Sequence, residues 1–552
     1  MEKLIECVPN FSEGRDASII KSITDEIERI EGVKLLDVDP GKATNRTVVT
    51  FVGSPEAVVE AAFHAIKKAS EVIDMTKHKG EHPRMGATDV CPLIPLSGIS
   101  VEETVKYANK LAERVGKELN IPVYLYEYAQ PNKDRNNLSV IREGEYEGYS
   151  KKIKKPEWKP DYGPTEFNVR SGASVIGVRD FLVAYNVNLN TTSVKRANSI
   201  AFDIRERGRV VKDEKGNDVN VPGALKAVKA IGWFIEEYGQ AQVSINLTNI
   251  NVTPVHIAFE EACKSALNRG MRVTGSELVG LIPLQSLLEA GKYFLKKQSR
   301  SIGVSESELI HIAVKSLGLD DLSEFHPEKK IIEYRMKNPA DSALQSLTVK
   351  AFADLTASES PAPGGGSISA YLGSLGAALG TMVANLSAVK KGWESRVEEF
   401  SVWAEKGQIL KDKLLKAVDE DTAAFNRIMA AFGLPKNTDA EKQARKDAIN
   451  NATINAIEVP YKVMQLSLES MTLIKAMAEI GNPNSVSDAG VGALCARSAV
   501  LGAHLNVKIN AAGLADKSAV GDLLKDAIGI ENDALRLETE ILGIVNKVIE
   551  KS

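Results

Sequence analysis

The sequence predicts a multidomain protein in which two α/β sandwich subdomains are followed by an all-α helical domain. The first reason is length, because 552 residues suggest about three or four units of typical domain size. The second is that strand and helix patterns alternate along the chain up to about Pro327. The third is that strand patterns almost vanish afterwards, where long stretches rich in Ala, Leu, Glu and Lys indicate helices.

Composition narrows the class of protein. The hydrophobic fraction is 43% and the charged fraction 26%, which is typical of soluble globular proteins. The formal net charge of -4 gives no basic excess that would attract nucleic acid, so we expect small-molecule substrates. The four cysteines have no paired spacing and suggest neither a zinc site nor a disulfide framework. With no apolar signal segment or membrane span in the pattern, we expect a cytoplasmic protein.

The first α/β subdomain is predicted over residues 1–180. Its strands are expected at 3–8, 33–38, 47–52, 90–96 and 123–126, and its helices at 16–30, from Ser54 onward and at 100–119. Ser54 precedes a first-turn proline, and Ser100 with Glu103 matches a capping box. This order of elements favours a sandwich with its helices on one face over a doubly wound sheet.

Three further parts complete the predicted organisation. A second α/β subdomain is expected over 181–326, a linker rich in Pro, Lys and Asp over 327–344, and the helical domain over 345–552. Strands at 181–189 and 240–247 and helices at 194–207, 254–266 and 284–295 are expected in the second subdomain. In the helical part, the glycines of the helix predicted at 369–387 are explained by close helix packing.

The stretch from His78 to Val90 is the first candidate site. It contains two histidines, several charged side chains and two glycines between a predicted helix and a predicted strand, so we expect a loop held by rigid elements. Pro83 stiffens the chain after His82, and Arg84 is suited to fix a substrate carboxylate. A solvated polar loop and a zinc site formed by His78 and His82 are the alternatives.

Asp421 is the second candidate. It interrupts an apolar helical stripe, and Asp419 lies well round the helix, where we expect it to be exposed or to support the site without touching the substrate. The stripe consists of Leu414, Val418, Phe425 and Ile428. Burial within such a stripe should raise the pKa of the carboxyl group, as a proton donor requires. The alternative is a buried acid paired with Lys or Arg.

Two further stretches have ordinary explanations from the sequence alone. The segment Gly163–Gly172 is rich in loop-forming residues, and Thr165, Glu166, Asn168 and Arg170 within it are able to hydrogen-bond a ligand, although a plain connecting loop is the simpler interpretation. Upstream lies a basic run that is interpreted as a solvated charge run, or as a group of lysines that attracts the carboxylates of a ligand. The run consists of Lys151, Lys152, Lys154 and Lys155.

Several motifs, in order, resemble the formimidoyltransferase-cyclodeaminase family over nearly the whole chain. The motifs are Cys7-Val8-Pro9-Asn10-Phe11-Ser12-Glu13-Gly14, Leu36-Asp37-Val38-Asp39, Asn45-Arg46-Thr47, Gly80-Glu81-His82-Pro83-Arg84-Met85-Gly86-Ala87, Asp161-Tyr162-Gly163-Pro164, Gly232-Trp233, Pro363-Gly364-Gly365-Gly366-Ser367, Asp419-Glu420-Asp421-Thr422-Ala423-Ala424-Phe425, Leu434-Pro435-Lys436 and Ser487-Asp488.

The resemblance implies a bifunctional folate enzyme of histidine breakdown. The two α/β subdomains would transfer the formimino group from N-formimino-L-glutamate to tetrahydrofolate, and the helical part would close the product to 5,10-methenyltetrahydrofolate and release ammonia. The resemblance makes His82 the transferase residue and Asp421 the cyclodeaminase proton donor. The implied folate-binding loop consists of Gly163, Pro164, Thr165, Glu166, Phe167, Asn168, Val169, Arg170, Ser171 and Gly172.

The expected partners are small molecules. Tetrahydrofolate, with or without a polyglutamate tail, would be a co-substrate, and no metal, nucleic acid or membrane is expected. We also expect a homo-oligomer in the cytoplasm.

The chemistry of the residues agrees with the transferase assignment. The folate amine must lose a proton and the glutamate amine must gain one, which suits an imidazole with a pKa near neutrality better than Glu81. One rival is a single-activity glutamate formimidoyltransferase whose helical part is a non-catalytic assembly module; another is a protein that only binds folate. Asp421 discriminates between the bifunctional enzyme and the rival with an assembly module, because a packing module would hold an apolar residue or an ion-paired acid at this position.

Overall fold

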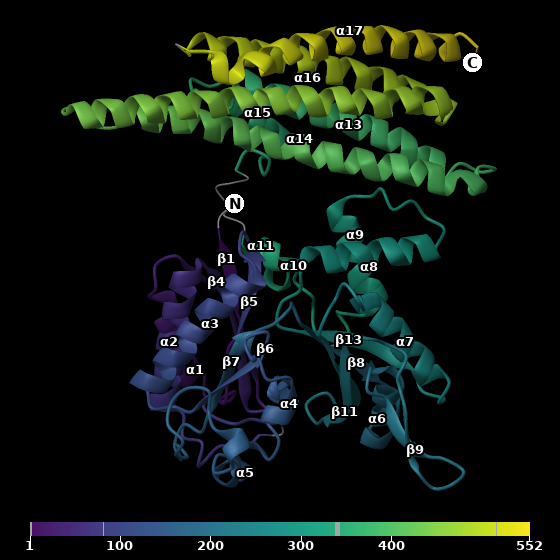
Figure 1. Cartoon of the computed structure of the whole chain (residues 1–552). Coiled ribbons are helices and arrows are strands. Elements are labelled where there is room, and N and C mark those ends of the chain that lie inside the picture. Colours follow the sequence, from purple (N-terminus) through teal and green to yellow (C-terminus); the bar gives the residue numbers. More distant parts are fainter. Residues whose placement is uncertain (1–2, 81, 337–342, 515, 552) are drawn as a thin grey trace. The chain divides into compact units, whose positions relative to one another are not determined.

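The computed structural model describes residues 3–80, 82–336, 343–514 and 516–551. It divides into two compact units, one formed by Met1–Ala290 and Ala313–Met336 and the other by Gly291–Ile312 and Lys337–Ser552. The first unit holds both α/β subdomains and the second is helical (Figure 1). The predicted fold class is therefore the one that the structure has.

A seven-stranded sheet forms the first subdomain. The strands run β1-β4-β2-β5-β7-β6, β3 pairs with β4, and only the pairings of β7 with β5 and β6 are parallel. The elements are β1 (Leu4–Cys7), β2 (Asn10–Phe11), α1 (Ala17–Glu28), β3 (Val33–Gly41), β4 (Arg46–Gly53), α2 (Pro55–Val72), β5 (Thr88–Ser97), α3 (Val101–Glu118), β6 (Val123–Glu127), α4 (Leu138–Ile141), α5 (Glu145–Lys152) and β7 (Ser174–Val178). Helices α1, α2 and α3 cover one face of the sheet, because each places an apolar stripe on it (Figure 1).

The predicted helix starts are correct in position but differ in detail. Ser100 accepts a hydrogen bond from the backbone N–H of Glu103 at 3.2 Å, which caps α3. The Glu103 carboxylate accepts from Lys3 Nζ at 2.7 Å, so the capping box is only half formed. Ser54 occupies the capping position of α2, where its side chain makes no cap bond and Pro55 supplies the first turn.

The second subdomain is built on a four-stranded antiparallel sheet in the order β11-β12-β8-β13. Its elements are β8 (Val183–Leu189), α6 (Val194–Ile204), β9 (Arg209–Lys212), β10 (Asp218–Val221), β11 (Val228–Ile235), β12 (Gln240–Leu247), α7 (Val255–Leu267), β13 (Val273–Val279), α8 (Leu284–Lys297), α9 (Glu306–Leu317), α10 (Pro327–Lys330) and α11 (Ile332–Met336). Figure 1 shows α6 and α7 on the outer side of this sheet, so the sheets of the two subdomains lie between their helices.

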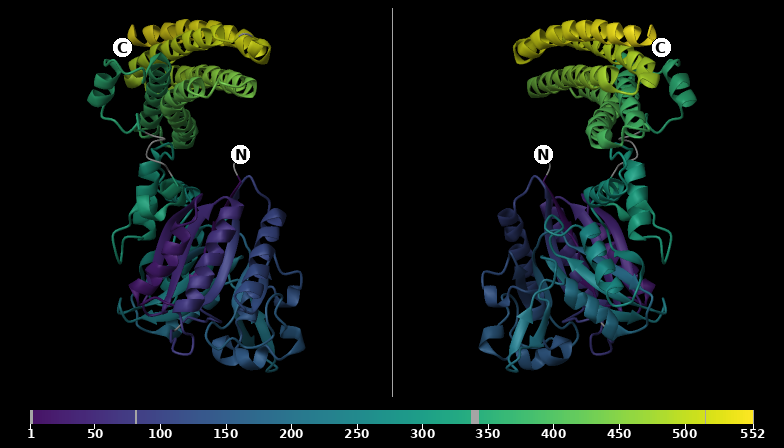
Figure 2. Two further views of the ribbon diagram at one scale, coloured as in Figure 1. Left: turned by 90° about the vertical axis from the view of Figure 1, so that its left-hand side faces the viewer. Right: turned by 90° about the vertical axis from the view of Figure 1, so that its right-hand side faces the viewer.

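Long helices make up the second unit, as the two views of Figure 2 show. They are α12 (Val349–Thr356), α13 (Gly365–Ala388), α14 (Val397–Phe432), α15 (Asp439–Ile480), α16 (Val486–Ala512) and α17 (Gly521–Ile549). Helix α13 has the length and composition of a membrane span, but 61% of its most apolar window is buried within the fold, as in the core helix of a bundle.

Close packing explains the glycines of α13, as predicted. A Cβ atom added at Gly373 would lie 2.5 Å from Oγ of Ser467, and one at Gly376 would lie 2.9 Å from the carbonyl oxygen of Gly492. Both distances are shorter than van der Waals contact, so glycine allows α15 and α16 to approach α13 closely.

The segment Gly291–Ile312 packs with the helical unit although the sequence places it in the second α/β subdomain. Lys292 pairs with Glu405 at 2.6 Å, and Oγ of Ser301 donates to Oδ1 of Asn385 at 2.7 Å. The predicted second subdomain, 181–326, therefore contains a segment that is anchored to α13 and α14.

Candidate functional sites

The loop that carries His82 lies between α2 and β5, as predicted. His82 is half-buried, and its Nδ1 lies 2.8 Å from the carbonyl oxygen of Pro83. A carbonyl only accepts hydrogen bonds, so Nδ1 carries the proton and Nε2 carries the lone pair. This contact fixes both the orientation and the tautomer of the ring and leaves Nε2 as the proton acceptor. Glu81, the weaker candidate, lies outside the described residues.

A buried ion cluster lies beside His82. Asp89 is fully buried on β5 and accepts from Nη1 of Arg46 and from Nη2 of Arg142, both at 2.5 Å. It also accepts from Nε of Arg142 at 3.3 Å and from the backbone N–H of Met85 at 2.9 Å. Two guanidinium groups therefore share one carboxylate, and the cluster carries one net positive charge.

Sequence reasoning missed this cluster as a unit. Arg46 and Asp89 are 43 positions apart, and Asp89 and Arg142 are 53 apart, so only the tertiary fold unites them. Arg46 stands in one of the quoted motifs and Asp89 in the His78–Val90 stretch, which were the available signals. Arg142, at the end of α4, stands in no motif.

The cluster changes the acid-base properties of His82. Burial, followed by the charges of Arg46 and Arg142, lowers the pKa of His82 to about 3. The expectation of a pKa near neutrality is therefore wrong for His82 in this structure. Asp89 acts in the opposite direction but its charge is already balanced by the arginines, which hold the pKa of that carboxyl well below its usual range despite its burial. His82 is thus neutral at pH 7.

His78 has a structural role. Its Nδ1 accepts from Nε of Arg84 at 3.2 Å, and its Nε2 lies 2.8 Å from the carbonyl oxygen of Asn45, to which it donates. Both ring nitrogens are therefore engaged, and neither is open to a zinc ion. Within residues 3–80, 82–336, 343–514 and 516–551, no group of three or more His, Cys, Asp or Glu side chains is arranged to hold a metal ion.

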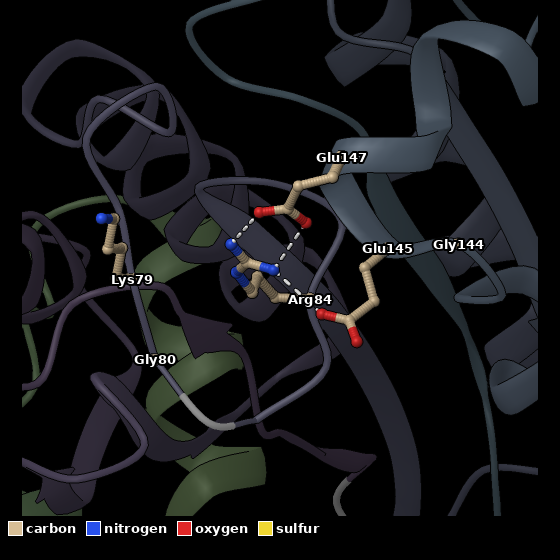
Figure 3. A pocket seen from close by; sticks show the side chains of 6 residues that line it. All are labelled: Lys79, Gly80, Arg84, Gly144, Glu145 and Glu147. Carbon is tan, nitrogen blue, oxygen red and sulfur yellow. Dashed lines mark hydrogen bonds and ion pairs between the residues drawn. The ribbon is translucent and has the colours of Figure 1, made fainter.

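Arg84 is paired within the protein and not open to a substrate carboxylate, which corrects the sequence-based expectation. Its guanidinium forms a two-pronged contact with Glu147, at 2.6 and 2.9 Å, and contacts Glu145 at 2.9 Å (Figure 3). These residues, with Lys79, Gly80 and Gly144, line a cavity of about 470 Å³. The Arg84 contacts join the His82 loop to α5.

The segment Gly163–Gly172 packs against the His82 loop at its far end. Gly172 has a φ of +66° and forms an antiparallel bridge with Gly86. Within the segment, Asn168 donates to the carbonyl of Asn120 at 3.2 Å, and Arg170 donates to the carbonyl of Glu71 at 2.6 Å. These two contacts hold the segment in place, and Arg170 is exposed, with only its Nη2 engaged in this bond.

Other side chains of this segment differ in their surroundings. Thr165 and Glu166 are exposed. Phe167 is half-buried, and its ring contacts those of Tyr146 and Tyr149 with centroids 5.5 and 5.6 Å apart. The segment is therefore anchored on α5 by an aromatic cluster while part of it faces solvent.

The basic run upstream is only partly solvated. Lys151, Lys154 and Lys155 are exposed, but Lys152 is buried. Its Nζ donates to the carbonyl oxygens of Val140, Ile141 and Glu143 at 2.9 to 3.0 Å and lies 3.8 Å from the ring centroid of Trp158. Burial lowers the pKa of Lys152 to about 8. The interpretation as a solvated charge run is wrong for this residue, which caps the end of α4.

Asp421 lies on α14 against the first turn of α13. Its Oδ2 accepts from Oγ of Ser367 at 3.0 Å, and a Cβ atom at Gly366 would lie only 2.2 Å from its Oδ1. The acid makes no ion pair with any residue that the structure describes, which excludes the predicted pairing with Lys or Arg among them. Burial raises the pKa of Asp421, while the Ser367 side chain and backbone donors oppose this.

Asp419 is buried, which corrects the expectation that it is exposed. Its carboxylate accepts from the backbone N–H of Leu344 at 2.8 Å and from the backbone and side chain of Gln345 at 3.3 and 3.1 Å. The helix pattern placed it away from the apolar stripe, but the segment that precedes α12 covers that side of α14. Asp419 therefore holds this segment to the bundle.

Three family descriptions match successive parts of the chain. Residues 4–179 match the formiminotransferase domain, N-terminal subdomain; residues 184–337 match the formiminotransferase domain; and residues 348–528 match formiminotransferase-cyclodeaminase. The three matches coincide with the two α/β subdomains and the helical part.

Known relatives match the whole chain and each half. A formimidoyltransferase-cyclodeaminase from Dictyostelium discoideum is 43% identical over 548 residues, which is 99% of both chains. A glutamate formimidoyltransferase from Thermoplasma acidophilum is 45% identical over 53% of this chain and 92% of its own. A methenyltetrahydrofolate cyclohydrolase from Methylorubrum extorquens is 38% identical over 37% of this chain and 97% of its own. The chain belongs to the formimidoyltransferase-cyclodeaminase family.

Proposed function

We propose that the two reactions of this bifunctional enzyme are carried out by His82 and Asp421. The chain is a formimidoyltransferase-cyclodeaminase, which transfers a formimino group from N-formimino-L-glutamate to tetrahydrofolate and then cyclises the product with release of ammonia. The observation that carries the assignment of His82 is its fixed Nδ1–H contact with Pro83, which directs the Nε2 lone pair away from the backbone.

In the first reaction, N5 of tetrahydrofolate attacks the formimino carbon and forms a new carbon–nitrogen bond. His82 Nε2 accepts the proton that N5 loses. The same proton then passes to the glutamate nitrogen, whose bond to the formimino carbon breaks, so that glutamate leaves as the amine. One imidazole thus serves as base and then as acid, provided that its pKa rises from about 3 when the substrates bind.

In the second reaction, N10 of 5-formimidoyltetrahydrofolate attacks the same carbon to close the ring. The amidine nitrogen gains two protons, the one that N10 loses and one from an acid, and leaves as ammonia when its bond to the carbon breaks. Asp421 is the proposed donor, because burial favours its protonated form and no cation among the described residues neutralises it. Ser367 holds the carboxyl group at the first turn of α13.

The segment Gly163–Gly172 is the proposed folate-binding loop. Its bridge to Gly86 places it beside the His82 loop, and its exposed Thr165 and Glu166 are available for polar contacts. A polyglutamate tail on tetrahydrofolate would be attracted by the exposed lysines upstream, which are Lys151, Lys154 and Lys155.

We also propose the predicted domain boundaries, at 1–180, 181–326, 327–344 and 345–552, a homo-oligomeric assembly and a cytoplasmic location. Limited proteolysis, size-exclusion chromatography with light scattering, and cell fractionation test these three proposals in turn. Cleavage within 291–312 in place of the linker would contradict the boundaries.

A single assay tests both activities. The pure protein is incubated with formiminoglutamate and tetrahydrofolate while methenyltetrahydrofolate absorbance and ammonia are followed. We expect one ammonia for each methenyl product. Transfer without ammonia would favour the assembly-module rival, and no turnover of formiminoglutamate would favour the folate-binding rival. Decay of the methenyl absorbance after it forms would reveal a cyclohydrolase activity like the one named in the Methylorubrum extorquens relative.

A further inference from the structure

Among the described residues, the cluster beside His82 contains two guanidinium groups and one carboxylate, so its positive charge exceeds its negative charge. The described charged groups that act on His82 are Arg46 of β4, Arg142 at the end of α4 and Asp89 of β5. Asp89 accepts four hydrogen bonds and is saturated by them. Within this described cluster one guanidinium charge exceeds the charge of Asp89, and only 8% of the Arg46 side chain and 14% of the Arg142 side chain are exposed.

Each arginine retains a nitrogen for a ligand. In Arg46, Nε donates to Oδ1 of Asn10 at 3.0 Å and Nη1 donates to Asp89. In Arg142, Nε and Nη2 are taken by Asp89. Among the described residues, Nη2 of Arg46 and Nη1 of Arg142 have no acceptor. Two arginine donors without an acceptor among the described residues, together with the excess positive charge of the cluster, call for an anion, and a carboxylate matches their geometry.

We propose that Arg46 and Arg142 form a carboxylate clamp that binds the α-carboxylate of N-formimino-L-glutamate beside His82. This inference rests on the proposed role of His82. The α-carboxylate is attached to the carbon that carries the reacting nitrogen, so a clamp next to the catalytic base holds the formimino carbon close to Nε2. The γ-carboxylate lies further along the side chain. The glutamate of tetrahydrofolate is excluded, because the aminobenzoyl group separates it from N5.

The clamp also explains how a base with a low pKa becomes effective. A bound carboxylate cancels the excess charge of the two arginines, which is one of the causes that keep His82 unprotonated. The donor substrate thereby strengthens the base that its own reaction needs. Departure of glutamate restores the positive field and favours loss of the proton from the ring.

Donor analogues test the clamp in the wild-type enzyme. N-formimino-isoglutamine replaces the α-carboxylate by an amide, and N-formimino-glutamine replaces the γ-carboxylate. We expect kcat/KM for transfer to fall about ten- to a hundredfold with the α-amide and much less with the γ-amide. Equal losses with the two analogues, or a larger loss with the γ-amide, would overturn the proposal.

A variant links the effect to the arginines. Arg142→Gln leaves Asp89 paired with Arg46, so no buried charge is left unpaired. It should lose as much activity with the normal donor as the wild type loses with the α-amide, and it should lose little more when the two changes are combined. Arg114→Gln, on the outer helix α3, is the matched control and should discriminate between donors like the wild type. Full additivity in Arg142→Gln would contradict the clamp.

The third readout is the titration of His82. It is monitored by NMR with ¹³C-labelled histidine, and the His82 signal is assigned by its absence in a His82→Gln variant. Glutamate should raise the pKa of His82 by about one or more in the wild type, and less in Arg142→Gln. This shift does not depend on turnover, and it remains decisive if Arg142→Gln is unstable. An unchanged titration at saturating glutamate would overturn the clamp. His82→Ala with undiminished transfer would instead overturn the proposed function.

Discussion

The two candidate sites use burial in opposite directions to the same end. At His82, burial and two arginines lower the pKa of a base; at Asp421, burial raises the pKa of an acid. In both cases the neutral form of the side chain is favoured, since desolvation penalises charge of either sign. The two sites differ in whether the polar groups around the side chain are charged or neutral. The transferase site lies in an ion cluster, whereas Asp421 has neutral donors from Ser367.

Because of this difference, the two side chains need different changes in pKa before they can transfer a proton. A neutral imidazole is ready to accept a proton, but its pKa must rise when substrate binds. A carboxyl group with a raised pKa is closer to the form that donates one. Substitutions at the two positions should therefore have separable consequences.

The largest effect is expected at the transferase site. His82→Ala removes the proposed base and should lower formimino transfer by about a hundredfold or more. Cyclisation of supplied 5-formimidoyltetrahydrofolate should stay close to the wild-type rate, because the reaction is assigned to another unit of the protein. Stopped assays of glutamate release and methenyl absorbance measure the two rates. Transfer within a few-fold of the wild type would show that His82 is not the base.

A loss of similar size is expected at the cyclodeaminase site. Asp421→Asn keeps size and polarity but removes the titratable proton, so cyclisation should fall by about a hundredfold or more while transfer persists. The 5-formimidoyl intermediate should accumulate, as followed by chromatography.

The control for Asp421 must be chosen from the structure. Asp419→Asn is unsuitable as a neutral control, because its carboxylate holds Leu344 and Gln345. Asp412, on the same helix, has 52% of its side chain exposed and pairs only with its neighbour Lys411 among the described residues. Asp412→Asn should leave both activities unchanged. If the folded Asp421→Asn variant cyclises like this control, Asp421 is a structural residue.

A smaller effect on the same site is expected from Gly366→Ala. The new Cβ atom would lie 2.2 Å from Oδ1 of Asp421 and must displace the carboxyl group. A displacement of this kind should lower cyclisation between about tenfold and a hundredfold, without loss of transfer. Gly364→Ala is the control, because a Cβ atom there meets nothing closer than 3.8 Å. Equal cyclisation rates in the two variants would mean that the position of Asp421 is not critical.

The smallest expected effect is on stability, where the two sites should respond to pH with opposite signs. The folded pKa of His82 lies below its ordinary value, so the native state loses stability as the pH falls below about 6.5. The folded pKa of Asp421 lies above 3.8, so stability is lost as the pH rises through it. Relative to the wild type, Tm should therefore rise in His82→Gln towards low pH and in Asp421→Asn towards high pH. Parallel pH profiles for both variants in calorimetry would contradict the opposite shifts.

Local pattern predicted much of this fold and part of each site. Helical spacing predicted that Asp421 interrupts an apolar face of α14, and burial raises its pKa as expected. The His82 loop was predicted from the change between a helical and a strand pattern. The loss of strand signals after the second subdomain correctly indicated the helical unit.

The remaining features depend on residues that are distant in sequence. Glu147, which accepts hydrogen bonds from Arg84, is 63 positions away in the sequence. Leu344, whose backbone N–H donates to Asp419, is 75 positions away. In the sequence, Lys152 is indistinguishable from the three exposed lysines beside it. In the structure, its Nζ donates to carbonyl groups at the end of α4. No periodicity reports such contacts, since tertiary packing decides which polar groups meet.

The most direct test of two separate sites is a mixing experiment. His82→Ala and Asp421→Asn are each incubated with formiminoglutamate and tetrahydrofolate, alone and together, while methenyl absorbance and ammonia are recorded. We expect His82→Ala alone to be nearly silent, Asp421→Asn alone to consume formiminoglutamate without releasing ammonia, and the mixture to form methenyltetrahydrofolate and ammonia after a lag. Ammonia release by Asp421→Asn alone at the wild-type rate, or rapid product formation by His82→Ala alone, would contradict the assignment of one reaction to each residue.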